Sequence, residues 1–361
     1  MRIEALLSRD PLSPFAVEHV EIDAPRAGEI LVRIEASGIC HTDLVSRAAG
    51  SAERPVLLGH EGVGVVESLG AGVDSVRVGD RVVLTFRSCG TCVNCVAARP
   101  AHCVKSVRLN QFGPRADRSP RITVHGGPVL DGFFGQSSLA RYALVTPDNV
   151  VVVDPWLDPV VAAPLGCGFQ TGAGAVLNVL RPEASEAFVI YGAGAVGLAA
   201  LLAARAVGVT RIVVVETAAG RRDTALRLGA AAVIDPTTID LVSAVREAGG
   251  AARHALDTTG QPQVLAAAVR ALAPGGTVVA VGLGRGVADL DVNEIVLPGK
   301  TIRGCLEGDS VPRTFIPRLV ELYRAGRFPM DELVTAYPYT DIEAALEDQR
   351  AGKIVKPVLT W

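Results

Sequence analysis

Residues 188–197 read FVIYGAGAVG, an apolar run of four residues followed by glycines at positions 192, 194 and 197. An Ala/Leu-rich segment then continues to Val207, so the glycines lie where a strand passes into a helix, the context that a dinucleotide-binding fingerprint requires. In such a turn Gly192 permits the tight bend, Gly194 lets a pyrophosphate approach, and Gly197 packs helix against strand. We expect Gly192, Gly194, Val196 and Gly197 to contact a dinucleotide.

Outward from this turn, strands and helices alternate over roughly a hundred residues. Expected strands cover 188–191, 211–216, 232–235, 254–258 and 277–282, and expected helices cover 195–207, 220–228, 239–248 and 262–272. This alternation predicts a parallel, doubly wound α/β sheet. Glu216 ends the second strand, nineteen residues after Gly197, where an acid can hold a ribose diol. The alternative reading of Glu216 is a solvated carboxylate at a strand end.

The regions on either side have a different texture. Short apolar runs at 30–36, 63–69 and 81–86 predict a mostly β region, and 106–136 is loop-like because of its prolines and glycines. Helices at 312–325 and 342–351 and a last strand at 356–360 follow residue 300. We therefore expect a mostly β domain over residues 1–160, completed by 301–361, and a nucleotide-binding domain over 161–300.

Composition sets further limits. The 361 residues are too many for one ordinary core, and 49% apolar residues can fill two. A net charge of −3 indicates no nucleic-acid partner, and neither a signal peptide nor a long apolar run suggests a membrane, so we expect a cytoplasmic protein. Seven cysteines, four of them clustered, favour metal binding over disulfides.

The clustered cysteines are the strongest chemical signal. Cys89, Cys92, Cys95 and Cys103 have the spacing C-x2-C-x2-C-x7-C, and four thiolates on one loop close a tetrahedral structural zinc site. The alternatives are four separately buried cysteines or an iron–sulfur cluster, whose ferredoxin spacings differ. His102 is superfluous to this set and is interpreted as a surface histidine.

A second set of candidate ligands comes from three distant places, Cys40, His60 and Cys167. Two thiolates and an imidazole leave a fourth position open, as in a catalytic zinc site. Thr42 adds a hydroxyl next to Cys40, and a carboxylate such as Asp43 can fix the tautomer of a ligand histidine. Taken alone, Cys167 is equally well explained as a buried small apolar residue.

With these three motifs in this order, the chain resembles the zinc-dependent medium-chain alcohol dehydrogenases nearly end to end. The resemblance implies a GroES-like catalytic domain, a Rossmann domain, and reversible oxidation of an alcohol by NAD. It implies that Cys40, His60 and Cys167 hold the catalytic zinc, that Asp43 orients His60, and that Thr42 takes the alcohol proton. It gives Glu61 a place beside the metal during ligand exchange.

The same resemblance places further residues on the cofactor. His41 and Lys356 match positions on the pyrophosphate, Thr171 lies near the nicotinamide, and Glu216 replaces the commoner Asp at the adenosine ribose. Apart from the resemblance, Arg221, one turn into the next helix, could compensate a phosphate together with Arg222, stack on the adenine or face solvent. Val45 stands where liver-type members have the histidine that ends the proton relay, so the exit of the proton stays open.

Within the family, the segments 133–138, 166–172 and 304–310 resemble the aryl (benzyl) and allylic alcohol dehydrogenase branch. This implies a roomy apolar pocket for a primary alcohol, with Phe86 as a candidate wall or an ordinary core aromatic. Two zinc ions per chain, NAD, a small alcohol or aldehyde substrate and a homo-oligomer (dimer or tetramer) are expected. The alternatives are a thiol-adduct formaldehyde dehydrogenase of the same family and a catalytically silent cofactor-binding protein.

Overall fold

The computed structural model describes residues 1–237, 239–250 and 252–361. Among these residues six parallel strands form one sheet in the order β13-β12-β11-β14-β15-β16. Their bounds are β11 (Ala187–Tyr191), β12 (Arg211–Val215), β13 (Ala232–Ile234), β14 (His254–Asp257), β15 (Thr277–Ala280) and β16 (Thr301–Gly304). The strand order reverses between β11 and β14, so a crevice opens at their carboxyl ends, where such sheets bind nucleotides.

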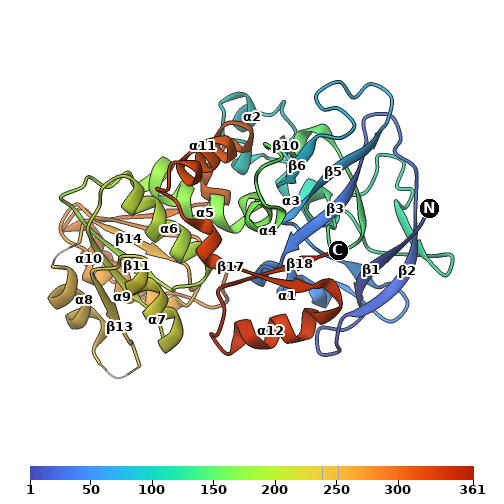
Figure 1. Cartoon of the computed structure of the whole chain (residues 1–361). Coiled ribbons are helices and arrows are strands. Elements are labelled where there is room, and N and C mark those ends of the chain that lie inside the picture. The colour runs from blue at the N-terminus through green and yellow to red at the C-terminus, as the bar shows by residue number, and fades with distance from the viewer. Residues whose placement is uncertain (238, 251) are drawn as a thin grey trace.

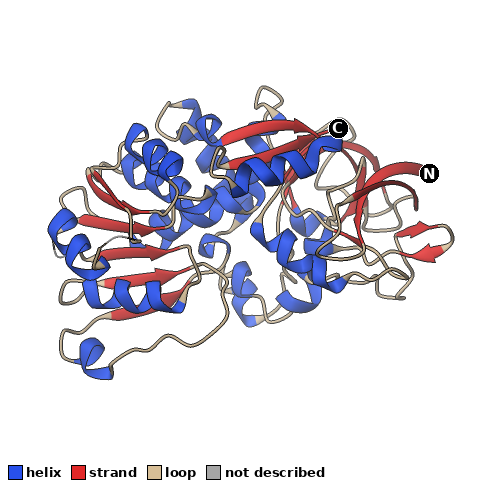
Figure 2. Cartoon of the chain, turned by 90° about the horizontal axis from the view of Figure 1, so that it is seen from below, coloured by secondary structure: helices blue, strands red, loops and turns tan. Residues whose placement is uncertain are grey.

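Helices connect these strands and surround the sheet (Figure 2). They are α6 (Ala195–Ala206), α7 (Ala219–Arg227), α8 (Leu241–Gly249), α9 (Pro262–Ala271) and α10 (Val292–Val296). The doubly wound sheet that the alternating pattern predicts is present. Two elements, α10 and β16, are not among the predicted helices and strands. Strand β16 was not predicted because Thr301–Gly304 contains a single large apolar residue and so lacks a strand-like apolar run.

The N-terminal region forms two sheets. One has the order β4-β1-β2-β7-β8, and the other has β10-β6-β5-β3-β18-β17 with β9 paired to β3. The bounds are β1 (Arg2–Ser8), β2 (Ala16–Ile22), β3 (Ile30–Gly38), β4 (Val56–Leu57), β5 (Gly62–Leu69), β6 (Arg81–Leu84), β7 (Ile122–Val124), β8 (Gly127–Pro128), β9 (Tyr142–Val145) and β10 (Val150–Val152). Residues 106–136 are therefore less loop-like than predicted, since β7, β8 and the short helix α3 (Ser106–Asn110) lie within them.

The C-terminal strands return to this second sheet (Figure 1). Strand β18 (Lys356–Thr360) pairs antiparallel with β3, and β17 (Val334–Pro338) adds to its other side. Two helices flank them, α11 (Pro312–Arg324) and α12 (Ile342–Arg350). The pairing places Val358 opposite Gly38, and so carries Lys356 to the turn that contains Cys40.

The two parts of the chain share a core. Leu165 and Phe169, next to Cys167, belong to the same buried apolar cluster as Ile190 of the central strand and Leu198 of α6. The helix α5 (Gly168–Gly174) packs so closely on α6 that a Cβ at Gly172 would lie 2.0 Å from the Val196 carbonyl oxygen. Full burial of such side chains contributes about 1.5–3 kcal/mol each, so this contact fixes Cys167 relative to the glycine-rich turn.

A search of the described residues for membrane-spanning helices finds no single helix of sufficient length and apolarity. One bent pair, Pro159–Gly166 with Gly168–Leu180, meets the criterion by length and composition only.

Candidate active site

The centre of the site is the turn between β3 and α1 (His41–Ser46). Asp43 Oδ2 accepts a hydrogen bond from the Cys40 backbone N–H at 3.0 Å, and Asp43 Oδ1 lies 2.9 Å from His60 Nδ1. The same Oδ1 accepts the Gly59 N–H at 2.9 Å. Gly59 has φ +94°, and a Cβ there would lie 2.4 Å from Leu139 N, so the position requires glycine. Asp43 thus fixes the His60 ring with Nε2 free to bind.

Three segments bring four potential metal ligands together. The ligand atoms of Cys40, His60, Glu61 and Cys167 all lie within 4.8 Å of one another. His60 Nε2 is buried and has no hydrogen-bond partner among the described residues. A hydrogen bond from Cys167 lowers the pKa of the Cys40 thiol well below its usual range, against the effect of burial. A thiolate, an orphaned imidazole nitrogen and a second thiol fit a zinc ion.

Lys356, expected on the cofactor pyrophosphate, pairs with the buried carboxylate of Glu61 and also borders the cavity beside the glycine-rich turn. Its Nζ lies 2.6 Å from Glu61 Oε2 and donates to the Ile39 carbonyl at 2.9 Å, and its side chain is 2% exposed. Glu61 also accepts the Gly168 N–H at 3.0 Å. The ammonium group therefore compensates the buried Glu61 carboxylate, because an unpaired buried charge is costly. These contacts hold Glu61 at the edge of the ligand cluster.

The four-cysteine lobe (residues 89–103) forms a separate cluster. The sulfur atoms of Cys89, Cys92, Cys95 and Cys103 lie within 4.8 Å of one another. Cys103 Sγ accepts N–H groups from Cys89 at 3.3 Å and Lys105 at 3.4 Å, and Thr91 lowers the pKa of Cys89 to about 6. Four sulfurs supported by N–H donors fit a closed zinc site.

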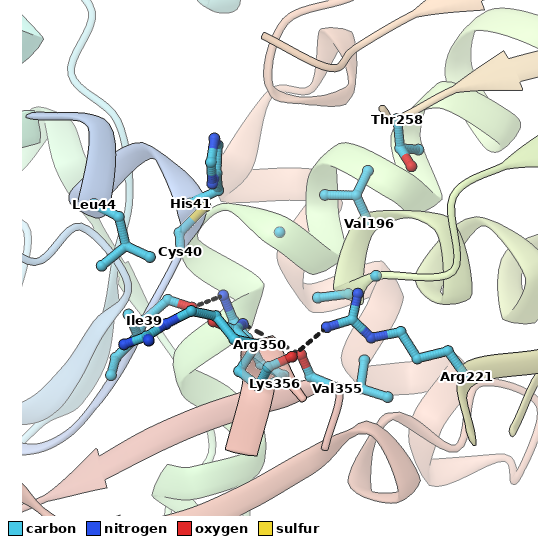
Figure 3. Close-up of a pocket in the computed structure, with 14 residues that line it drawn as sticks. Ile39, Cys40, His41, Leu44, Val196, Arg221, Thr258, Arg350, Val355 and Lys356 are labelled. Atoms are coloured by element: carbon cyan, nitrogen blue, oxygen red, sulfur yellow. Dashed lines mark hydrogen bonds between the residues drawn. The ribbon is translucent and has the colours of Figure 1, made fainter. Parts of the chain in front are cut away.

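A cavity of about 370 Å³ lies between the nucleotide-binding sheet and the turn at Cys40 (Figure 3). Cys40 and His41 border it on one side, and Val196 and Thr258 on the other. A Cβ at Gly194 would project into open space here, whereas at Gly197 it would lie 1.9 Å from the Gly192 carbonyl oxygen. The glycine-rich turn therefore leaves room for a pyrophosphate at the start of α6, as a dinucleotide requires.

Other predicted cofactor residues lie around this cavity in different ways. Arg221 borders it and donates to the Gln349 carbonyl at 2.7 Å, and Arg350, which sequence analysis did not single out, borders it too. Thr171 is buried in α5 and is not among the residues lining the cavity. Glu216 is also outside the lining; its carboxylate accepts the N–H groups of Ala193 at 2.7 Å and Ala218 at 2.9 Å.

A second, larger cavity of about 710 Å³ adjoins the ligand cluster. Thr42 and Glu307 lie at its metal end, and its walls are largely apolar, with Phe86, Phe112, Phe133, Phe134, Leu283 and Leu306. The ring of Phe134 stacks on the imidazole ring of His60, with 4.6 Å between the ring centroids. Thr42 Oγ1 lies 3.8 Å from Cys40 Sγ, so its hydroxyl faces the place where a ligand on the metal would bind. Phe86 is the pocket wall that the sequence suggested.

Sequence analysis missed Glu307. Its side chain is buried, its Oε1 accepts from Cys167 Sγ at 3.7 Å, and burial raises its pKa to about 7. Nothing in its local sequence marks it as buried, because the contact joins residues 140 positions apart.

Two family models match this chain. Residues 26–155 match the alcohol dehydrogenase GroES-like domain, and residues 195–324 match the zinc-binding dehydrogenase domain. The chain is 45% identical to geraniol dehydrogenase of Castellaniella defragrans over 99% of its own length and 97% of that protein. It belongs to the zinc-dependent medium-chain alcohol dehydrogenases.

Solved structures of this family superpose closely. An alcohol dehydrogenase zinc-binding domain protein from Burkholderia ambifaria has a TM-score of 0.95 at 44% identity, and benzyl alcohol dehydrogenase from Acinetobacter calcoaceticus has 0.94 at 39%. Each alignment covers 100% of this chain and 99% of the other. The predicted family, the GroES-like and Rossmann fold class, and the classification as a zinc-containing alcohol dehydrogenase are confirmed.

Proposed function

We propose that this enzyme oxidises primary allylic and aryl alcohols reversibly to aldehydes, with NAD as the hydride acceptor. The observation that carries the proposal is the 710 Å³ cavity, whose four phenylalanines adjoin Cys40, His60 and Cys167 on the side of Thr42. A flat, unsaturated group suits aromatic walls. Relatives that match over nearly their whole length are named for geraniol and benzyl alcohol, and this supports the same substrate class.

The residues of the site divide the work. Cys40, His60 and Cys167 would hold the zinc, and Asp43 keeps His60 Nε2 directed at it. The bound zinc supplies Lewis-acid polarisation at the alcohol oxygen. Thr42 would accept the alcohol proton at Oγ1 as it passes its own hydroxyl proton on, by an exit route that stays open, and the apolar walls exclude water. The glycine-rich turn and His41 position the cofactor, whose nicotinamide receives the hydride.

A thiol-adduct formaldehyde dehydrogenase would share the metal ligands but needs polar groups for its larger, charged substrate. Among the described residues that line the 710 Å³ cavity, Glu307 is the one Asp, Glu, Lys or Arg, and it is acidic. This lining favours an apolar alcohol. A formaldehyde assay with added thiol separates the two activities.

Substrate selectivity tests the proposal. We expect kcat/KM for benzyl and cinnamyl alcohol to exceed that for ethanol by roughly 10²-fold, because burying about 100 Å² more apolar surface contributes ~2.5 kcal/mol. Cyclohexylmethanol is the matched control, since it has similar size without the π-system. Equal kcat/KM for ethanol and benzyl alcohol would refute the substrate class.

We propose two zinc ions per chain with separate roles. The four sulfurs of the 89–103 lobe close one shell, so that metal stabilises the fold. Cys95→Ser should lower the melting temperature, and it should reduce the zinc content by one ion per chain. Metal analysis and thermal melts measure both. A Cys95→Ser protein with unchanged melting temperature would contradict a folding role for this metal.

We also propose that Glu216 selects NAD over NADP. A 2′-phosphate about 4 Å from its carboxylate would cost roughly 4 kcal/mol at an effective dielectric of 20, before screening. Two nearby arginines already have partners, since Arg221 donates through Nη2 to the Gln349 carbonyl and Arg222 pairs with Asp235 at 3.0 Å, although Arg221 Nε has no partner among the described residues. We expect kcat/KM to favour NAD by one to a few powers of ten.

Glu216→Gln tests the role of the charge, because it removes the negative charge and keeps a side chain long enough to reach the N–H groups of Ala193 and Ala218. The variant should reduce the ratio of kcat/KM for NAD to kcat/KM for NADP, which steady-state kinetics with both cofactors measure. Equal kcat/KM for NAD and NADP in the unmodified enzyme would show that Glu216 does not select the cofactor.

The expected homo-oligomer stays a proposal. It is supported by β16, one of the two edge strands of the parallel sheet, all four of whose residues are exposed. Exposed edge strands are usually covered or paired. The mass in solution by light scattering tests it, and a monomer at micromolar concentration would contradict it.

A further inference from the structure

One wall of the large cavity is a loop held in an uncommon backbone conformation. Residues 306–310 connect β16 to α11, and Leu306 and Glu307 line the cavity. Three consecutive residues have left-handed φ, at Glu307 (50°), Gly308 (67°) and Asp309 (46°). Two of these are not glycine. Backbone of this kind persists only where surrounding contacts hold it.

The inner side of this loop is held by the helix that begins after Cys167. The Ser310 hydroxyl donates to Gln170 Oε1 at 2.9 Å, and the Asn178 amide donates to the Gly308 carbonyl at 3.0 Å. A Cβ at Gly174 would lie 2.3 Å from that same carbonyl oxygen. The loop therefore has no room to move toward α5.

The outer side is held by Asp309, which joins two distant parts of the chain. Asp309 Oδ1 lies 2.9 Å from His102 Nε2, and Oδ2 accepts from Arg303 at 2.6 Å. His102 belongs to the four-cysteine lobe, directly before Cys103. Its other neighbour, Ala101, is buried and lines the same cavity. The lobe thus borders the cavity and contacts the loop that closes it.

We propose that the four-cysteine lobe positions the 306–310 loop through the His102–Asp309 contact and so sets the shape of the substrate cavity. His102 is then a positioning residue as well as an exposed histidine, and the lobe has a role in selectivity beyond stabilising the fold. The loop in turn places Leu306 on the substrate and Glu307 against Cys167. The substrate part of this proposal rests on the proposed function, whereas the loop's position does not.

His102→Ala removes the contact, and His102→Gln restores a donor of similar reach. His19→Ala is the matched control, because His19 is an exposed histidine on β2. In zinc-loaded His102→Ala we expect faster hydrogen–deuterium exchange in a peptide covering 306–310, with zinc content and melting temperature unchanged. The ratio of kcat/KM for cinnamyl alcohol to that for ethanol should change by roughly threefold to fivefold, as for a partly exposed polar contact. His102→Gln should recover most of both effects.

Unchanged exchange at 306–310 in His102→Ala would overturn the proposal. So would an equal loss of kcat/KM for all alcohols that accompanies loss of zinc, since that is the signature of a purely structural role. If the unmodified protein oxidised no alcohol, the proposed function would fail, and the exchange measurement would still decide whether His102 positions the loop.

Discussion

Cys167→Ser will lose alcohol oxidation and keep its fold. Cys167 caps α5 and is buried, and its sulfur lies within 4.8 Å of the ligand atoms of Cys40 and His60. Serine fits the same space but keeps its proton at neutral pH and so does not replace a thiolate ligand. Loss of a catalytic zinc removes several kcal/mol of transition-state stabilisation, so we expect kcat to fall by roughly 10³-fold or more.

Cys305→Ser is the matched control for this variant. Cys305 is also buried and forms no disulfide among the described residues, yet it belongs to neither cluster of potential metal ligands. We expect the control to keep both zinc ions and most of its activity, while Cys167→Ser lacks one zinc and melts within a few degrees of the unmodified protein. Near-normal turnover by Cys167→Ser would remove Cys167 from the ligand set.

Thr42→Val is the second change with a large expected effect. Valine has the shape of threonine without the hydroxyl, and a positioned proton-transfer group contributes roughly 10²–10⁴ to the rate. We therefore expect kcat at neutral pH to fall within that range, with zinc content and the KM for NAD little changed.

Thr42→Ser keeps the hydroxyl and is expected to retain most of the activity. Val45, which lines the large cavity and has no titratable group, offers a second comparison: Val45→Ala should affect the substrate KM and not proton transfer. If Thr42→Val turned over as fast as Thr42→Ser, proton transfer would have to begin elsewhere.

The parts of this molecule that the sequence could predict are those with local requirements. Gly192 has φ +96°, and Gly197 has no room for a Cβ. Both positions therefore require glycine, and their fixed spacing can be recognised in the sequence. The four cysteines of the lobe likewise lie within one short segment. Cys40, His60 and Cys167 have no diagnostic spacing; their residue types suggested a catalytic metal site, the resemblance supported it, and the fold brings their ligand atoms together.

What could not be predicted depends on contacts between distant residues. Lys356 contacts Glu61 because β18 pairs with β3, and no local sequence pattern predicts this pairing. Glu307 meets Cys167, and His102 meets Asp309, for the same reason. His102 is exposed, as the sequence suggested, but its contact with Asp309, 207 residues later in the chain, becomes visible only in the fold.

The most direct test of the central claim is NADH formation from cinnamyl alcohol by one preparation before chelation, after chelation and after zinc is returned. We predict steady NADH formation by the zinc-loaded enzyme, its loss as the zinc bound at Cys40, His60 and Cys167 is removed, and its recovery in proportion to the zinc that rebinds. A fully zinc-loaded, folded protein that forms no NADH from cinnamyl alcohol, or one that forms it equally well without zinc, would contradict the account.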